Sequence, residues 1–416
     1  MSSERKARAL AHNDRYLSPA KGELFRAIGI DLVIGRREGY SLWDLDGKEL
    51  LDLHLNGGTY NLGHRHPELV AALRGALDDE CLDVGNHHFP SEARGALAEA
   101  LVASAPEGIA RVVFASGGGE AVDVAIKSVR RATGRRRIVS AEGGYHGHTG
   151  LALAAGAARF RAPFLSDGDP GAFTHVPFGD LDALDRALAP GDAAAVILEP
   201  IPATAGFLLP PEGYLAGVRA RCDAHGALLI ADEVQTGLGR TGALWAIDGY
   251  GVRPDVIVSA KGLSGGLYPI AATLLSEAAG AWLRTDSHGH VSTFGGAELG
   301  CRVAQKVLEI TTREATRDNV LFVASRLAEG LADLAARRPF LREVRQRGLV
   351  IGLSFARPDG GVHVMRRLYD LGVWAIVAGF DYGAIQVKPG LLWDEATTAR
   401  ALETLDAAIG DVARVL

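Results

Sequence analysis

Residues 227–240 read A-L-L-I-A-D-E-V-Q-T-G-L-G-R, an apolar run that ends on the carboxylate of Asp232 and then enters a glycine-punctuated turn. The next apolar run along the chain, D-V-I-V-S-A-K-G at 255–262, is closely followed by a single lysine, Lys261. Short apolar runs bounded by turn residues are typical of strands that are buried on both faces. The two stretches therefore predict successive buried strands, with an acid and a lysine just beyond them.

Working outward from these two runs, the chain alternates between strand and helix patterns. Strand-like runs occupy 111–115, 137–141 and 194–200, and helical periodicity occupies 120–131 and 214–226. Short apolar strands that alternate with helices predict a mostly parallel sheet covered on both faces. We therefore expect an α/β fold.

The two ends of the chain have a different pattern from the middle. Residues 38–53 alternate around an Asp-Gly turn, which predicts a hairpin, and the glycine-rich loop that follows leads into a helix at Pro67. After about residue 300 we expect helices at 301–337 and 394–415, and strands near 349–355, 373–377 and 384–388. We predict an arm and hairpin at 1–55 that join the small domain, a large domain at 56–300, and a small C-terminal domain at 301–416.

Composition restricts the class of protein. The chain has 416 residues, a formal net charge of -6 and a pI of about 6.1, which argues against a general nucleic-acid or anionic-membrane binder. Three widely spaced cysteines, Cys81, Cys222 and Cys301, predict inert thiols in a reducing compartment and no metal site. The charged N-terminus lacks the apolar core of a signal peptide, and no run is long enough to span a bilayer. We expect a cytoplasmic protein.

Four features fall at the carboxyl ends of predicted strands, where open α/β sheets bind their ligands. They are the glycine run A-S-G-G-G-E-A-V at 115–122, the segment G-G-Y-H-G-H-T at 143–149, Asp232 and Lys261. Each has an ordinary structural interpretation: a tight turn, a packed loop aromatic, a helix cap or turn residue, and a surface lysine. Their convergence at one edge of the sheet favours a ligand site.

One cofactor, pyridoxal phosphate, uses all four features together. A helix N-terminus after the glycine run can bind its phosphate, and the aromatic Tyr145 can stack on its ring. Its aldehyde bonds a lysine, and its ring nitrogen must stay protonated, which a buried carboxylate ensures. Our hypothesis is that Lys261 holds the aldehyde and Asp232 holds the nitrogen at opposite ends of the ring.

From about residue 38 to 392 the chain resembles the class III pyridoxal-phosphate aminotransferases, of the aspartate-aminotransferase fold, fold type I. The motifs that carry the resemblance are G-H-R-H-P at 63–67, S-G-G-G-E-A at 116–121, Y-H-G at 145–147, L-E-P-I at 198–201, A-D-E-V-Q-T-G-L-G-R-T-G at 231–242, S-A-K-G at 259–262 and S-T-F-G-G at 292–296. The resemblance implies a large domain with a mostly parallel seven-stranded sheet and a small α/β domain built from both termini.

The resemblance also implies roles for individual residues. Lys261 is expected to be the Schiff-base lysine and proton shuttle, and Asp232 to be the partner of the ring nitrogen. The remaining expected cofactor contacts are Gly118 and Gly119 at the phosphate, Tyr145 at the ring, Gln235 near the ring hydroxyl, and His146, Glu199 and Thr293. Because Thr293 is similar to a threonine that reaches the phosphate of the neighbouring subunit, a homodimer with shared active sites is implied.

Two departures from the family pattern affect the phosphate and the substrate. The family's phosphate turn usually reads N-S-G-S-E-A, so a serine hydroxyl is missing at Gly119. Many members also have a glutamate and an arginine, which grips a substrate carboxylate, at the positions of Thr204 and Gln386. We therefore expect a principal substrate other than a simple α-amino acid: a neutral or hydroxyl-rich amine or carbonyl, such as an amino sugar or a biosynthetic intermediate.

Other residues are candidates for substrate contact. Arg240 and Lys388 could recognise an amino-acid co-substrate, although an arginine at 240 can equally brace its loop. Tyr60, in the glycine-rich loop, could touch the substrate or pack in the core.

The sequence leaves three functions open. The leading one is an aminotransferase that moves an amino group between small-molecule amine and carbonyl substrates. Because the fate of the substrate carbanion depends on the pocket, an isomerase, epimerase, aminomutase or lyase on the same fold is the first alternative. A non-catalytic binding partner is the second, and the presence of Lys261, Asp232 and Gln235 argues against it.

Overall fold

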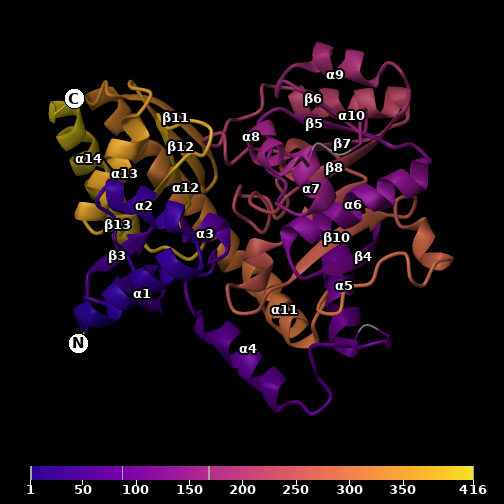
Figure 1. Ribbon diagram of the computed structural model, residues 1–416, viewed down its shortest axis with the longest axis horizontal. Coiled ribbons are helices and arrows are strands. Elements are labelled where there is room, and N and C mark those ends of the chain that lie inside the picture. The colour runs from indigo at the N-terminus through magenta and orange to yellow at the C-terminus, as the bar shows by residue number, and fades with distance from the viewer. Residues whose placement is uncertain (1, 87, 167–168, 416) are drawn as a thin grey trace.

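The computed structural model describes residues 2–86, 88–166 and 169–415, and the chain forms two lobes (Figure 1). The larger lobe holds the middle of the chain. The smaller lobe holds both ends of the chain, the N-terminal segment in indigo and the C-terminal segment in yellow. Among the described residues, no helix is both long and apolar enough to cross a membrane.

The larger lobe is built on a seven-stranded sheet with the order β4-β10-β9-β8-β7-β5-β6. The strands are β4 (Ile109–Ala115), β5 (Arg137–Ala141), β6 (Phe173–Val176), β7 (Ala193–Leu198), β8 (Leu228–Asp232), β9 (Val256–Ser259) and β10 (Ala271–Ser276). Among the described strands of this sheet, only β10 runs antiparallel to its neighbours, and the other pairings are parallel. The expected mostly parallel seven-stranded sheet is confirmed.

Helices cover both faces of this sheet. Alternate strand residues point to opposite faces, so Val196 and Leu198 join one apolar cluster while Ala195 and Ile197 join the other. The first cluster packs under α5 (Glu92–Ser104), α9 (Leu181–Leu188) and α10 (Tyr214–His225), and the second under α6 (Gly118–Thr133) and α7 (Gly150–Ala155). Two buried faces explain why the strands read as continuous apolar runs.

The smaller lobe combines both ends of the chain. One sheet joins β1 (Ile34–Glu38), β2 (Ser41–Asp44) and β3 (Glu49–Asp52) to the C-terminal β13 (Val373–Trp374). The other orders β11 (Leu341–Arg347), β12 (Val350–Phe355), β15 (Ala384–Val387) and β14 (Ile376–Val377). The associated helices are α1 (Ser2–Tyr16), α2 (Pro19–Ala27), α12 (Glu314–Arg337), α13 (Gly360–Asp370) and α14 (Glu395–Val415). The small α/β domain is thus built from both termini, as expected.

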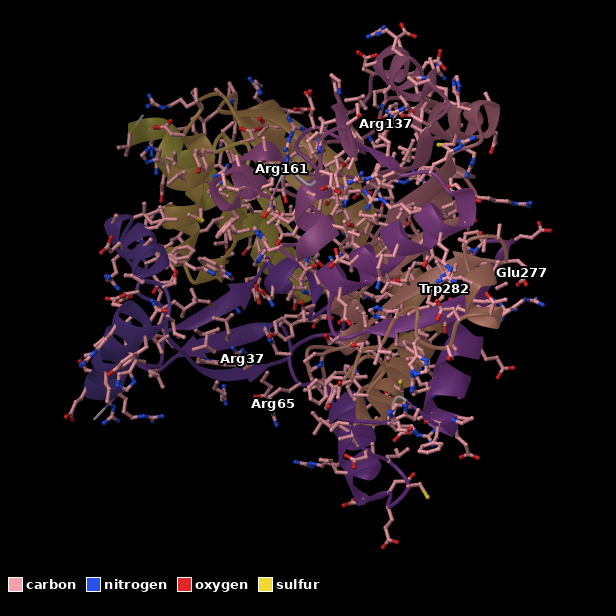
Figure 2. The ribbon with its side chains drawn as sticks, turned by 45° about the vertical axis from the view of Figure 1, so that its right-hand side comes forward. Arg37, Arg65, Arg137, Arg161, Glu277 and Trp282 are labelled. Atoms are coloured by element: carbon pink, nitrogen blue, oxygen red, sulfur yellow. The ribbon has the colours of Figure 1, made fainter. Side chains whose placement is uncertain are left out.

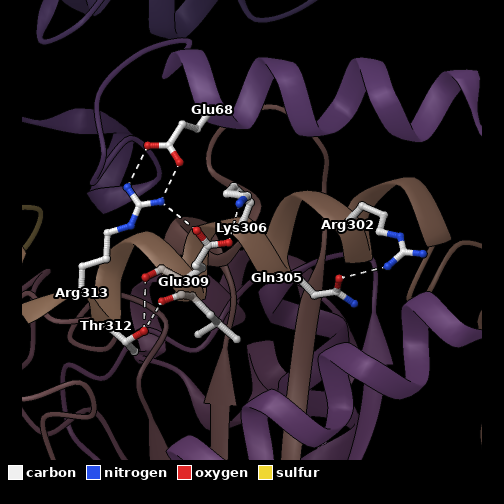
Figure 3. A network of polar contacts seen from close by, with 8 residues as sticks. Glu68, Arg302, Gln305, Lys306, Glu309, Thr312 and Arg313 are labelled. Carbon is white, nitrogen blue, oxygen red and sulfur yellow. Dashed lines mark hydrogen bonds and ion pairs between the residues drawn. The ribbon is translucent and has the colours of Figure 1, made fainter.

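The expected helical stretch at 301–337 is two helices, α11 (Glu298–Thr312) and α12, which meet at Arg313. Figure 3 shows how this break is held. The Arg313 guanidinium donates to Glu68 at 2.6 and 2.8 Å and to Glu309 at 2.8 Å. Since Glu68 lies in the first turn of α4 (Pro67–Asp78), the junction is tied to the helix that follows the glycine-rich loop.

Shorter elements complete the chain. They are α3 (Leu55–Gly58), α8 (Ala158–Arg161) and four 3₁₀ turns, Ala162–Phe164, Asp248–Tyr250, Lys261–Ser264 and Ala281–Arg284. Figure 2 shows Glu277 just beyond β10, where it accepts from Arg111 at 3.3 Å and from Arg284. Because Arg111 lies on β4, this contact closes the end of the antiparallel pair.

Candidate active site

A cavity of about 520 Å³ lies in the larger lobe, at the carboxyl ends of the parallel strands. Residues that follow β4, β5, β7, β8 and β9 all line it, as the strand-end argument predicts. These include Gly118, Tyr145, Glu199, Asp232 and Lys261. The features singled out in separate segments of the sequence therefore meet in one place.

Asp232 ends β8 and is buried, with one carboxylate oxygen bonded to a histidine. Its Oδ2 lies 2.7 Å from His146 Nδ1, and its Oδ1 accepts the Val234 amide at 3.1 Å. Burial opposes protonation of His146, but the Asp232 hydrogen bond and the charges of Asp232 and Glu199 raise its pKa. His146 thus holds the orientation of the Asp232 carboxylate, which keeps lone pairs for a further donor.

Glu199 directly follows β7 and supports the same wall. Its Oε1 accepts the Tyr145 amide at 3.0 Å, and its Oε2 accepts the Ala203 amide at 3.3 Å. Burial, followed by the nearby charge of Asp232, raises the pKa of this carboxyl to about 7. Its two backbone partners make Glu199 the clamp that fixes the Tyr145 segment.

Lys261 begins the turn after β9 and reaches into the cavity. Its φ of 40° lies in the left-handed region, which is strained for a residue with a side chain. A Cβ on Gly57 would stand 3.1 Å from Lys261 Cε and 3.3 Å from Gln235 Oε1, so the glycine-rich loop lies directly against both side chains. Burial lowers the pKa of Lys261, which favours the neutral, nucleophilic amine.

The glycine run also lines the cavity, where a Cβ on Gly118 would lie 3.4 Å from Ala260 Cβ. Gly117 is the N-cap of α6 and supplies no side-chain acceptor, so the first amides of the helix are available to an anion. The chain is tightly packed here: a Cβ on Gly147 would lie 2.7 Å from Gly119 Cα. This backbone cradle is the expected position of the phosphate.

Tyr145 forms one side of the cavity. Its ring packs edge-on against His148 and Phe160, with ring centroids 5.4 and 5.5 Å away. Burial raises the pKa of its hydroxyl. Aromatic packing on its outer side leaves Tyr145 as a fixed wall for a flat ligand.

The structure brings together most of the predicted cofactor residues but leaves Thr293 apart. Gly118, Gly119, Tyr145, His146, Glu199, Asp232, Gln235 and Lys261 all line the cavity. Thr293 is exposed, in a segment whose neighbours Val291 and Phe294 are also exposed. Among the described residues, Thr293 is not part of the cavity wall of its own chain.

The substrate candidates occupy different places. Tyr60 lines the cavity, whereas Thr204, Arg240, Gln386 and Lys388 are outside the wall formed by the described residues. Arg240 is buried and donates to the carbonyls of Leu349 and Pro389 at 3.2 and 2.9 Å and to the side chain of Asn61. These contacts are those of a brace between segments.

Lys388 is fully buried without an acidic partner in the described structure. Its Nζ donates to Gln386 Oε1 at 2.5 Å, lies 3.4 Å from His54 Nδ1, and sits 4.8 Å from the centre of the Phe207 ring. Burial, and the positive charges of Arg240 and Lys261, lower its pKa well below the ordinary value. At position 386, where the family resemblance predicts an arginine, the side-chain amide oxygen of glutamine therefore accepts a hydrogen bond from Lys388.

Several residues of the cavity wall are not among the site residues predicted from the sequence. Ser116, Ser264, Pro269 and Ile270 line it. Three of them belong to the stretch L-S-G-G-L-Y-P-I that directly follows Lys261. Proximity in sequence to the lysine is the signal that could have identified them.

The buried carboxyl of Glu233 makes the free energy of unfolding depend on pH, and it can be changed without altering the cavity. It follows Asp232 but points away into the core, where it accepts the Thr236 hydroxyl and the Ile247 amide at 2.5 and 2.7 Å. Burial raises its pKa to about 7. Below the ordinary carboxyl range both states are protonated. As pH rises toward 7 the unfolded state ionises first, so the free energy of unfolding decreases.

We expect Glu233→Gln in the cofactor-free protein to flatten that decrease by about 2–3 kcal/mol between pH 5 and 8. The amide can keep both hydrogen bonds because the Thr236 hydroxyl can accept as well as donate. Urea unfolding at the two pH values measures the effect, with the exposed Glu403→Gln as control. An unchanged pH slope would contradict it.

The residues present fit pyridoxal phosphate. The cavity offers a helix N-terminus for a phosphate, an aromatic wall, a histidine-supported carboxylate and a lysine with lowered pKa. A Cβ on Gly57 would crowd both Lys261 and Gln235. A Cβ on Gly119 would lie 2.9 Å from Thr149 Oγ1. Glycines at these two positions therefore keep space free for a ligand.

Comparison with known proteins agrees with this chemistry. The family described as Aminotransferase class-III matches residues 26–409. The chain is 50% identical over 406 residues to an uncharacterized aminotransferase of Archaeoglobus fulgidus, covering 97% of this chain and 94% of that protein. It is 36% identical to the putrescine aminotransferase of Pectobacterium atrosepticum, over 87% of this chain and 79% of that protein.

A solved structure has the same fold. The taurine:2-oxoglutarate aminotransferase of Bifidobacterium kashiwanohense, in complex with pyridoxal phosphate and glutamate, matches with a TM-score of 0.89 and 27% identity over 98% of each chain. The expected type I fold is thereby confirmed. The chain belongs to the class III aminotransferases, a family of pyridoxal-phosphate-dependent enzymes.

Proposed function

We propose that this aminotransferase acts on a neutral or hydroxyl-rich amine, such as an amino sugar or a secondary-metabolite intermediate, and uses a carbonyl compound as acceptor. The observation that carries the proposal is the pair at positions 386 and 388. Gln386 presents a neutral amide where many relatives present a guanidinium, and its oxygen is taken by Lys388 Nζ. Thr204 replaces the glutamate that would neutralise such an arginine.

When bound, pyridoxal phosphate supplies an aldehyde that condenses with amines and a ring that accepts electrons from the substrate carbon. Asp232 would hold the proton on the ring nitrogen, and the hydrogen bond to His146 fixes the orientation of that carboxylate. The first amides of α6 would bind the phosphate, Tyr145 would provide an aromatic wall for the ring, and Gln235 would be a further polar contact to the cofactor. Lys261 Nζ would move the proton to and from the substrate carbon, because burial lowers its pKa and so favours the neutral amine.

The proposed assembly is a homodimer. Thr293 and its exposed apolar neighbours Val291 and Phe294 form a segment suited to a second copy of the chain. In that arrangement Thr293 reaches the phosphate in the partner's cavity. Sedimentation of the purified protein tests the assembly, and a monomer with full activity would contradict it.

The function is tested by recording the visible absorption of the cofactor-loaded protein during single additions of amines. The panel holds glutamate, alanine, ornithine, putrescine, taurine and several amino sugars. We expect an amino sugar or another neutral amine to bleach the band fastest, and a carbonyl compound to restore it. A band that shifts without bleaching would instead indicate the isomerase, epimerase, aminomutase or lyase class.

Introducing the missing arginine should change the response to glutamate. In Gln386→Arg alone, Lys388 Nζ loses its acceptor and faces a second cation, so we expect little gain. In Gln386→Arg with Lys388→Val, the guanidinium can form a bidentate pair with a carboxylate, and glutamate reactivity should rise about tenfold or more. Stopped-flow bleaching measures this rise. Unchanged glutamate rates in both variants would overturn the proposed role of position 386.

A further inference from the structure

Tyr60 is the aromatic residue that the glycine-rich loop contributes to the cavity wall. Its ring lies against His64, with centroids 4.1 Å apart and planes inclined by 37°. Its hydroxyl makes no hydrogen bond to any residue that the structure describes. A fixed ring with an unpaired hydroxyl on a cavity wall combines bulk with a polar group available to a ligand.

Gly266 provides the space that Tyr60 occupies. A Cβ at this position would stand 2.2 Å from Tyr60 Cε1 and 2.3 Å from its Cδ1, far inside van der Waals contact. Gly266 also has a φ of 69°, which favours glycine independently of space. Gly266 lines the same cavity, so the tyrosine and the glycine form a matched pair on one wall.

His64 supports the other side of the ring. Its Nε2 lies 2.9 Å from Asp52 Oδ2, and both residues are buried. Asp52 Oδ1 accepts the amides of His54 and Leu55 at 2.9 and 2.8 Å. Because a carboxylate can only accept, His64 must donate from Nε2, and the ring plane under Tyr60 is fixed.

We propose that Tyr60 is the specificity-determining residue of this cavity, and that its ring, held between Gly266 and His64, excludes branched amines while its hydroxyl binds an oxygen of the substrate. Within the proposed class of neutral or hydroxyl-rich amines, this favours an open-chain amine with a hydroxyl or carbonyl oxygen within reach of the phenol over a cyclic amino sugar. His64 is a positioning residue that acts through Tyr60. This inference rests on the proposed function.

The hydroxyl is tested with Tyr60→Phe. The probes are 4-aminobutanol and butylamine, which differ by one hydroxyl, in single-turnover reactions of the cofactor-loaded protein. We expect the ratio of their kcat/KM values to fall about tenfold toward the alkylamine, the effect of losing one hydrogen bond. Tyr250→Phe removes a hydroxyl outside the cavity and should leave the ratio unchanged.

The ring is tested with Tyr60→Ala and a branched probe, 3-methylbutylamine. Opening the wall should raise kcat/KM for the branched amine relative to butylamine about tenfold or more. His64→Asn should move the same ratio in the same direction through KM, because it loosens the ring without removing it.

The matched pair is tested by adding a methyl group. Gly266→Ala should weaken cofactor binding and change the ratio of kcat/KM for 3-methylbutylamine to that for butylamine. When Tyr60→Ala is present in the same chain, the effect of Gly266→Ala on this ratio should disappear. Gly251→Ala is the control, because Gly251 has the same φ of 69° but nothing within 4 Å of an added Cβ. It carries the backbone strain without the clash.

The outcomes separate this inference from the proposed function. If the wild-type protein bleaches with none of the probes or panel amines, the proposed function fails. If it reacts but Tyr60→Phe and Tyr60→Ala leave both substrate ratios at the wild-type values, the role of Tyr60 is refuted. A Gly266→Ala effect that persists in the double variant would refute the matched pair.

Discussion

Lys261→Ala is expected to reduce turnover by about 10³-fold or more, the largest loss of any single substitution in this cavity. The lysine is the only amine among the described residues that line the cavity, and its lowered pKa suits it both to bond an aldehyde and to move a proton. The variant keeps the α6 N-terminus, Tyr145 and Asp232. We therefore expect it to bind the cofactor without a covalent bond.

Two measurements separate this loss from misfolding. Borohydride reduction should attach the cofactor permanently to the wild-type chain, at the peptide that contains Lys261, and should fail to attach it to the variant. The cofactor-free variant should be at least as stable to urea as the wild type, because it no longer buries an amine. Lys306→Ala, at a half-buried position of α11 outside the cavity, is the matched control. A Lys261→Ala protein with substantial turnover would refute the assignment of this lysine.

Sequence reasoning predicts the larger lobe well where a strand has clear ends. The apolar runs identify β4, β5, β7, β8 and β9, because each is flanked by charged or glycine residues. β6 reads F-T-H-V and has one fully buried residue, so it lacks the pattern of a doubly covered strand. β10 is apolar but continues from the apolar loop G-L-Y-P-I without a boundary, and only the family resemblance supplies the count of seven.

The same contrast holds within the site. The carboxyl-end residues could be predicted because neighbouring parallel strands deliver their ends to one edge. The approach of Gly57 to Lys261 could not, because it depends on how a loop from one segment packs on the turn of another. The contact between Lys388 and Gln386 could not be predicted from the sequence for a related reason. Gln386 lies in β15 and Lys388 directly follows the last residue of this strand, so alternation predicts both side chains on one face. Only the packed structure shows that the lysine donates to the amide oxygen of Gln386.

Asp232→Asn is the second substitution with a large expected effect, a fall in turnover of about 10²–10³-fold. An asparagine has the size of the aspartate but no charge, so it cannot hold a proton on the ring nitrogen of the cofactor. It also removes the carboxylate partner of His146. Because the Asp232 hydrogen bond raises the pKa of His146 against the effect of burial, the pKa of this histidine should fall in the variant.

The pH dependence distinguishes this electrostatic role from a simple loss of packing. In the wild type, protonated His146 stabilises the fold below the ordinary histidine pKa, and this stabilisation is lost as pH rises through its raised folded-state pKa. We expect Asp232→Asn to remove that slope in the cofactor-free protein, as measured by urea unfolding and by NMR titration of the imidazole. Asp255→Asn is the control: Asp255 precedes β9 at the opposite edge of the sheet, where it bonds Arg219 at 2.7 Å. The Asp255→Asn variant should lose stability at all pH values and keep its turnover. An Asp232→Asn protein with an unchanged His146 titration would contradict the pairing of Asp232 with His146.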